Sequence, residues 1–234
     1  MSIGKTVGMR EYRRHLPHQI PPDRPIFLTW NLKGAIPRRV ANRLQKYREE
    51  LQSQPPRPNE TPRNRAVREG KMTFARVDRY LDAAKSGPLH LSLPKCAATV
   101  DRAIRWHARD RYSLLAWCVM PNHAHVLLTP HLELWKITKG IKGFTARKIN
   151  RELHRTGNPL WQDESYDHWI RDEEELLRVV HYIEMNPVKA GLCAQAADWE
   201  FSSARLRQNW NAGEPIPAEF IPTPKSIAGL TEEP

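Results

Sequence analysis

Residues 112–129, YSLLAWCVMPNHAHVLLT, hold two runs of β-forming residues with a turn signal between them. The runs extend from Tyr112 to Val119 and from His123 to Thr129, and Pro121-Asn122 lies between them. Proline presets its own φ and asparagine tolerates unusual backbone angles, so the pair favours a tight turn. The pattern predicts an antiparallel β-hairpin.

The second strand of this hairpin carries His123 and His125 on one face, because side chains two residues apart in a strand point to the same side. Ala124, Val126 and Leu128 share the opposite face and suit burial against helices. The imidazoles should therefore point away from that core, where they could hold one divalent cation. Alone, a His-x-His triplet is weak evidence, because two ordinary half-exposed histidines on a sheet give the same pattern.

The composition indicates a polyanionic partner. The chain has 234 residues, enough for one domain with a sizeable core plus extensions, or for two small domains. Its 37 Lys and Arg residues against 26 Asp and Glu residues give a formal charge of +11. A surplus of this size is typical of proteins that bind nucleic acid, although a basic and inert surface has the same composition.

The three cysteines, Cys96, Cys118 and Cys193, are far apart and form no C-x-x-C pair. This spacing argues against a disulfide framework and against a cysteine-rich zinc site. We also find no apolar segment long enough for a signal peptide or a membrane span. The expected location is therefore a reducing cytosol.

The order of the predicted elements favours an α+β sandwich, with an antiparallel sheet covered by helices on one face. We expect a basic arm at 1–24, one domain at 25–207 with a polar mobile insertion at 52–70, and a Pro-rich disordered tail at 208–234. Further patterns predict strands at 25–31, 160–162 and 166–170, and helices at 38–51, 74–84, 94–107, 134–153, 172–186 and 198–207.

The predicted helix at 172–186 carries the candidate nucleophile. Asp172 is a plausible N-cap, and three glutamates follow it where the helix dipole favours negative charge. Tyr182 lies roughly 100° from the centre of the apolar stripe, and Asn186, four residues on, shares its flank. A tyrosine at the edge of a core gives the same pattern. If it is functional, Tyr182 is the nucleophile and Asn186 a third metal ligand through its amide oxygen.

Several segments together resemble the single-tyrosine HUH transposases (His, hydrophobic residue, His) of the IS200-like superfamily. The similarity is greatest to the branch associated with repetitive extragenic palindromes (REP). His123-Ala124-His125 fits the HUH motif, Tyr182 takes the nucleophile position and Asn186 the position of a third ligand. The segments that carry the resemblance are CVMPNHAHVLL (118–128), LWQDESYDHWIRD (160–172), HYIEMNPVKAGL (181–192) and DWEFSSAR (198–205).

This resemblance implies a ferredoxin-like core and cleavage of single-stranded DNA beside a hairpin. Tyr182 would attack the phosphodiester, keep the 5′-phosphate and release a 3′-OH, and a second transfer would rejoin the ends. The resemblance implies a divalent cation, Mg²⁺ or Mn²⁺, held by His123, His125 and Asn186. It implies no nucleotide cofactor and no membrane partner, and a monomer rather than a homodimer. It also implies a location in the bacterial cytosol, in association with the nucleoid.

Basic side chains provide candidates for contacts with DNA phosphates, and Trp30 and Trp161 are candidates for stacking on unpaired bases. A solvated basic surface explains the same cations equally well. The basic candidates are Arg10, Arg13, Arg14, Arg38, Arg39, Lys136, Lys139, Lys142, Arg147, Arg151 and Lys189.

Three other functions compete with this interpretation. A hairpin DNA-binding regulator of the same fold would bind DNA without cutting it. A two-histidine phosphodiesterase acting on RNA ends would use His90-Leu91-Ser92, but its second motif is missing, because His123-Ala124-His125 lacks the required Ser or Thr. A replication initiator or conjugative relaxase would carry helicase or second-tyrosine elements, which we do not find in the chain.

Overall fold

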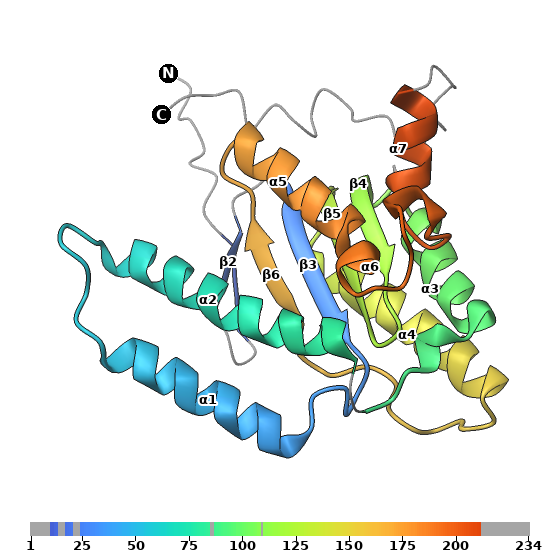
Figure 1. Ribbon diagram of the computed structural model, residues 1–234, viewed down its shortest axis with the longest axis horizontal. Helices are drawn as coiled ribbons and strands as arrows, with labels where there is room; N and C mark the ends of the chain where they lie inside the picture. The colour runs from blue at the N-terminus through green and yellow to red at the C-terminus, as the bar shows by residue number, and fades with distance from the viewer. Residues whose placement is uncertain (1–9, 14–16, 21–23, 85–86, 109, 212–234) are drawn as a thin grey trace, which may run out of the picture.

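The computed structural model describes residues 10–13, 17–20, 24–84, 87–108 and 110–211. Its centre is an antiparallel sheet whose strands lie in the order β4-β5-β3-β6 (Figure 1). Because β5 is an inner strand, the histidine pair lies in the middle of the sheet. The strands are β3 (Ile26–Asn31), β4 (Tyr112–Val119), β5 (His123–Pro130) and β6 (Tyr166–Trp169).

The predicted hairpin is confirmed as β4 and β5, and the Met120 amide closes its turn by donating to the carbonyl of His123 at 2.8 Å. A bulge between Leu114 and Ala116 shifts the alternation of β4. Leu114 and Trp117 consequently face one hydrophobic cluster, whereas Ala116 faces the other. The hairpin thus contributes apolar side chains to both faces of the sheet.

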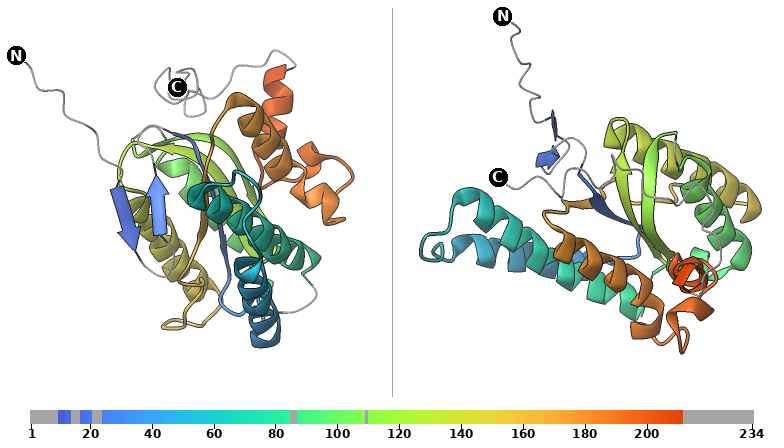
Figure 2. Two further views of the ribbon diagram at one scale, coloured as in Figure 1. Left: turned by 90° about the vertical axis from the view of Figure 1, so that its left-hand side faces the viewer. Right: turned by 90° about the horizontal axis from the view of Figure 1, so that it is seen from above.

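The connections β3-α3-β4-β5-α4-β6 produce the expected ferredoxin-like arrangement. Helices α3 (Pro94–Trp106) and α4 (Leu134–Glu152) cover one face. The α+β class is confirmed, but the expectation that helices cover only one face is wrong. Helices α2 (Pro62–Ala83) and α5 (Glu173–Glu184) cover the opposite face (Figure 2, right), where they pack on Phe27.

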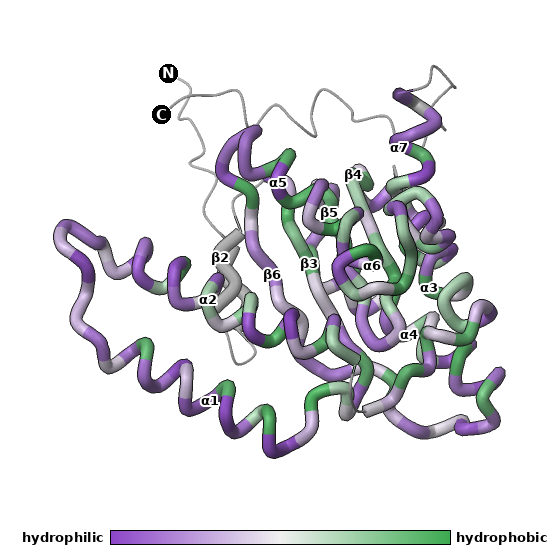
Figure 3. The backbone as a smooth tube through the Cα atoms, in the orientation of Figure 1, coloured by the Kyte–Doolittle hydropathy of each residue, from purple (hydrophilic) through white to green (hydrophobic). Residues whose placement is uncertain are grey.

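Helices α1 (Arg38–Ser53) and α2 form a long helical hairpin that extends beyond the β6 edge of the sheet (Figure 1). Residues 62–70, expected to belong to an irregular insertion, are therefore helical. Pro62 occupies the first turn, where a proline needs no amide hydrogen, and Thr61 caps it by accepting from the Asn64 amide. Figure 3 shows that α1 and the outer part of α2 are mostly hydrophilic.

The remaining elements lie mainly at the two ends of the chain. Of the N-terminal arm, Arg14 lies outside the described residues, and the tail is described only as far as residue 211. Within the described part, no helix is long and apolar enough to cross a membrane. These elements are β1 (Arg10–Arg13), β2 (Pro17–Ile20), η1 (His90–Ser92), α6 (Asn186–Lys189), η2 (Ala196–Asp198) and α7 (Ala204–Asn211).

Glu175 joins α2 to the first turn of α5. Its buried carboxylate accepts from Lys71 at 2.5 Å, from His168 at 3.0 Å and from Arg171 at 3.2 Å. Burial alone would raise the pKa of Glu175, but the hydrogen bonds from His168, Arg171 and Lys71 outweigh it and hold the pKa well below 4.5. The carboxylate therefore stabilises the fold in its ionised form.

Replacing Glu175 by glutamine should lower the free energy of unfolding at pH 7 by about 2 kcal/mol, because three donors lose their charged acceptor. A depressed pKa contributes stability above the ordinary pKa of the carboxyl and loses it as the pH falls. The gap between wild type and variant should therefore narrow below about pH 4. Urea unfolding at pH 7 and at lower pH measures both effects. Glu174→Gln, at an exposed neighbour, is the control, and equal losses in the two variants would contradict this role of Glu175.

Candidate active site

The two histidines of β5 lie on the face of the sheet opposite α3 and α4, as predicted, but they are fully buried rather than half-exposed. Their Nε2 atoms are 3.0 Å apart. The Nδ1 atom of His125 lies 2.7 Å from the Thr29 hydroxyl of the neighbouring strand β3. Both rings are thus held with their Nε2 atoms turned toward the same point.

Asn122, in the turn before β5, determines the protonation of His123. Its amide nitrogen donates to the carbonyl of Leu81 at 2.9 Å, so its Oδ1 must be the atom that faces His123 Nδ1 at 2.6 Å. Because an amide oxygen only accepts, His123 carries its proton on Nδ1 and presents a lone pair at Nε2. Burial lowers the pKa of His123 to about 3, which also favours the neutral ring. This is the form of imidazole that binds a metal.

Replacing Asn122 by alanine should weaken binding of Mn²⁺ about 10-fold to 100-fold, because groups that orient a ligand histidine typically contribute this much. Isothermal titration of the protein with Mn²⁺ measures the change. Asn122→Asp serves as the matched variant, since its carboxylate still accepts from His123 and should restore most of the affinity. Unchanged affinity in Asn122→Ala would remove Asn122 from the site.

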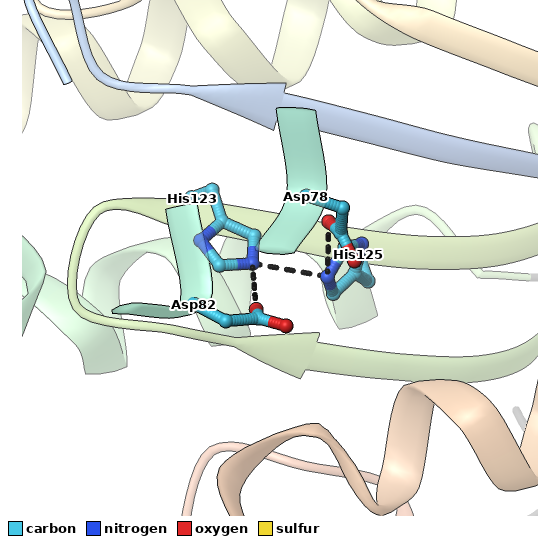
Figure 4. Close-up of side chains that lie close together, drawn as sticks. All are labelled: Asp78, Asp82, His123 and His125. Carbon is cyan, nitrogen blue, oxygen red and sulfur yellow. Dashed lines mark hydrogen bonds and ion pairs between the residues drawn. The ribbon is translucent and has the colours of Figure 1, made fainter. Parts of the chain in front are cut away.

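Two carboxylates approach the histidines from α2 (Figure 4), and nothing in the sequence patterns had drawn attention to them. An Asp78 oxygen lies 3.4 Å from His125 Nε2, and an Asp82 oxygen lies 3.5 Å from His123 Nε2. Burial, aided by the charge of Asp82, raises the pKa of Asp78 to about 8, and burial raises that of Asp82 to about 6. Their spacing of four residues on a helix was the only available signal.

The groups at this point fit a divalent cation. Ligand atoms about 2.1 Å from a metal and at right angles to each other are about 3 Å apart, which matches the separation of the two Nε2 atoms. Three side-chain oxygens at the site are buried without a hydrogen-bond partner, and such atoms are costly unless something pairs with them. They belong to Asp78, Asp82 and Asn186.

Tyr182 lies beside this cluster. Its ring centroid is 5.8 Å from that of His125 and 6.0 Å from that of Phe27, which it meets edge to face. The side chain is only partly buried, so the predicted nucleophile is neither enclosed in the core nor turned away from the histidines. The ammonium group of Lys189 lies 4.7 Å from the centre of the phenol ring and places a positive charge next to it.

Asn186 reaches the same point, since its amide nitrogen lies 3.1 Å from His125 Nε2. Helix α5 ends at Glu184, and Asn186 begins the short helix α6, so the predicted helix is divided in two. The Asp172 side chain caps α5 as expected, by accepting from the Glu175 amide at 2.7 Å. The structure therefore brings together the four predicted site residues, His123, His125, Tyr182 and Asn186.

The candidate DNA contacts are distributed over both sides of the molecule. Arg38 and Arg39 are exposed on α1, which packs against α2 on the side of the histidines. Helix α4, which carries Lys136, Lys139, Lys142, Arg147 and Arg151, covers the opposite face. Arg10 and Arg13 lie in β1, where side chains are not described.

Three of the candidates for contacts with DNA have structural roles. The ammonium group of Lys142 donates to the carbonyls of Gln162 at 2.7 Å and Asp163 at 3.0 Å, so it ties α4 to that loop. Trp30 and Trp161 are 1% and 5% exposed and meet edge to face with ring centroids 6.4 Å apart. The proposal that they stack on bases is wrong, because their apolar rings are part of the core.

Residues 99–186 match the family model described as IS200-like transposase. This segment includes both histidines, the tyrosine and Asn186. In this segment the chain is similar to IS200-like transposases. Asp78 and Asp82 lie before the segment that matches, on the preceding helix α2.

The chain also has relatives among curated proteins and solved structures. A REP-associated tyrosine transposase of Escherichia coli (strain K12) is 34% identical over 100 residues, which cover 41% of this chain and 56% of that protein. The alignment therefore spans little more than half the length of this relative. A solved structure of a REP-associated tyrosine transposase bound to a REP hairpin is 22% identical, with a TM-score of 0.49, and covers 89% of this chain and 90% of that one.

Proposed function

We propose that this protein is a metal-dependent, single-stranded DNA endonuclease and strand transferase of the REP-associated type, which acts near hairpins in the bacterial cytosol. The observation that carries the proposal is the convergence of His123, His125, Asn186 and Tyr182 from separate elements on one point. The similarity to IS200-like transposases and to a REP-associated tyrosine transposase supports the same activity.

In the proposed reaction, the oxygen of Tyr182 attacks a DNA phosphorus atom and forms a 5′-phosphotyrosine bond. The bond to the 3′ oxygen breaks, and a 3′-OH strand end is released. A phenol has a pKa of about 10, so at neutral pH it needs assistance. The neighbouring Lys189 favours the ionised phenol through its charge. His123, His125 and Asn186 would hold a divalent cation, which when bound would polarise the phosphate and stabilise developing charge.

The direct test is a search for the covalent intermediate. The full-length protein is incubated with Mn²⁺ and labelled single-stranded oligonucleotides that contain hairpins from its own genome, and the products are separated on a denaturing gel. The proposal requires a labelled band that resists denaturation and disappears on proteolysis. Hairpin binding without this band would instead favour a DNA-binding regulator with the same fold.

We further propose that DNA follows the face of the sheet on which α2 and α5 lie, past α1 next to it, since the histidines lie on that face. The double variant Arg38→Gln/Arg39→Gln should bind all hairpins more weakly, whatever their sequence. The slope of log binding constant against log salt concentration should become shallower by about 1.5 to 2. Fluorescence anisotropy at several salt concentrations measures the slope. Arg147→Gln/Arg151→Gln on α4 is the matched pair, and a larger reduction there would place the DNA on the opposite side.

A further inference from the structure

Helix α2 places the carboxylates of Asp78 and Asp82 next to the uncharged imidazole rings of the histidine pair. The Asp78 and Asp82 side chains are 2% and 21% exposed, and each has a buried oxygen that no hydrogen bond satisfies. His123 offers them no positive charge, since its proton is on Nδ1 and bound to Asn122. Among the ion pairs of the described residues, these aspartates have only the two imidazoles as partners.

Such an arrangement is costly unless a cation completes it. Burying a carboxylate without an ion-pair partner is unfavourable, and a second carboxylate one helical turn away adds repulsion, which the more distant charge of Lys189 offsets only in part. The ligand atoms of both aspartates and both histidines nevertheless lie within 4.8 Å of one another. The Asn186 side chain is fully buried on α6. Its amide nitrogen lies 3.1 Å from His125 Nε2, and its oxygen has no hydrogen-bond partner.

We propose that Asp78 and Asp82 are ligands of the divalent cation, so that this chain holds it with two imidazoles, the Asn186 amide and two carboxylates. The inference rests on the proposed function for the presence of the cation, and it adds the two ligands from α2. Carboxylate oxygens match the hard ions Mg²⁺ and Mn²⁺, and the mixed donor set of nitrogen and oxygen suits Mn²⁺ in particular.

This assignment gives the helical hairpin a role in the site. The histidines come from β5, at the centre of the sheet, whereas the aspartates come from the end of α2 that lies over the sheet (Figures 1 and 4). A cation bound by all four side chains ties α2 to β5. Because ligands that bind only the folded state stabilise it, the cation should also protect the protein against unfolding.

The test is to titrate Mn²⁺ into the full-length protein and into Asp78→Asn and Asp82→Asn, by calorimetry and by thermal unfolding. Each amide should weaken Mn²⁺ binding at least tenfold and remove most of the rise in Tm that Mn²⁺ causes. Without metal, the variants should unfold at the same temperature as wild type or higher, since an amide carries no charge that burial could penalise. This measurement also establishes that they fold.

Asp101→Asn is the matched control, because Asp101 is buried on α3, away from the histidine face. Its Oδ1 accepts from Trp117 at 2.7 Å and its Oδ2 from Arg105 at 3.4 Å, and an amide oxygen could still accept from Trp117. Its Mn²⁺ affinity should stay within twofold of wild type. Wild-type affinity in both Asp78→Asn and Asp82→Asn would overturn the assignment, and if wild type still formed the DNA adduct the proposed function would stand. Lost Mn²⁺ binding in these variants, with no adduct in wild type, would confirm the ligands and reject the DNA reaction.

Discussion

Tyr182→Phe is expected to lower the yield of the covalent protein–DNA adduct by about 10³-fold or more, while the protein still binds a DNA hairpin. The substitution removes the oxygen that would attack phosphorus and leaves the ring. Since the ring packs edge to face on Phe27, phenylalanine retains that contact, and stability should change by less than about 0.5 kcal/mol. Adduct yield on a denaturing gel and hairpin affinity by anisotropy measure the two results.

Tyr166 provides the matched control, because it is a second tyrosine in the same aromatic cluster. Its ring stacks on that of Phe74 with the centroids 3.8 Å apart, and its centroid lies 6.2 Å from that of the Phe27 ring. Burial raises the pKa of the Tyr166 hydroxyl, so less of it is ionised at neutral pH than of an ordinary phenol. Tyr166→Phe should keep the adduct. An adduct that persists in Tyr182→Phe and is lost in Tyr166→Phe would reassign the nucleophile.

His125→Ala is expected to lower Mn²⁺-dependent DNA cutting on the order of 100-fold or more and to weaken Mn²⁺ binding to a similar degree. His125 is the central side chain of the cluster, with neighbours in Thr29, Asp78 and Asn186. His123→Ala should lower both quantities as well, since the Nε2 atom of His123 lies 3.0 Å from that of His125. Cleavage of labelled hairpin DNA and titration with Mn²⁺ are measured on the same preparation.

His181→Ala is the control for this experiment. His181 precedes the candidate nucleophile on α5 but is exposed and takes no part in the cluster. Cutting and Mn²⁺ binding should both remain at the wild-type level in this variant. If His125→Ala cut DNA with Mn²⁺ as well as wild type did, the histidine pair would not be the metal site, whatever its geometry.

Local patterns were sufficient for the elements that carry the predicted site. Alternation along residues 123–128 places His123 and His125 on one face of β5, and the observed strand has that alternation. The capping residue Asp172 and the apolar stripe that follows it predicted α5, and with it the position of Tyr182. These features depend on residues only a few positions apart, so they can be predicted from the sequence alone.

The burial of side chains could not be predicted in the same way. Trp30 and Trp161 are of a residue type that often stacks on bases, yet their rings pack on each other. Trp30 lies in β3, and Trp161 lies in a segment far along the chain. Lys142 has the pattern of an exposed cation, yet a loop twenty residues later supplies carbonyls for it. Whether a side chain meets DNA or protein depends on neighbours that are distant in sequence.

By itself, the sequence determined the β-hairpin, the shared face of its two histidines and the capped helix that carries Tyr182, because each follows from short-range periodicity and turn chemistry. Only the tertiary structure decided that helices cover both faces of the sheet, that the histidines are buried and that Asp78 and Asp82 join them. Those outcomes depend on α2 packing across a sheet whose histidine strand lies some forty residues later in the chain. The free energy of such a long-range contact cannot be predicted from residues that are neighbours in the sequence.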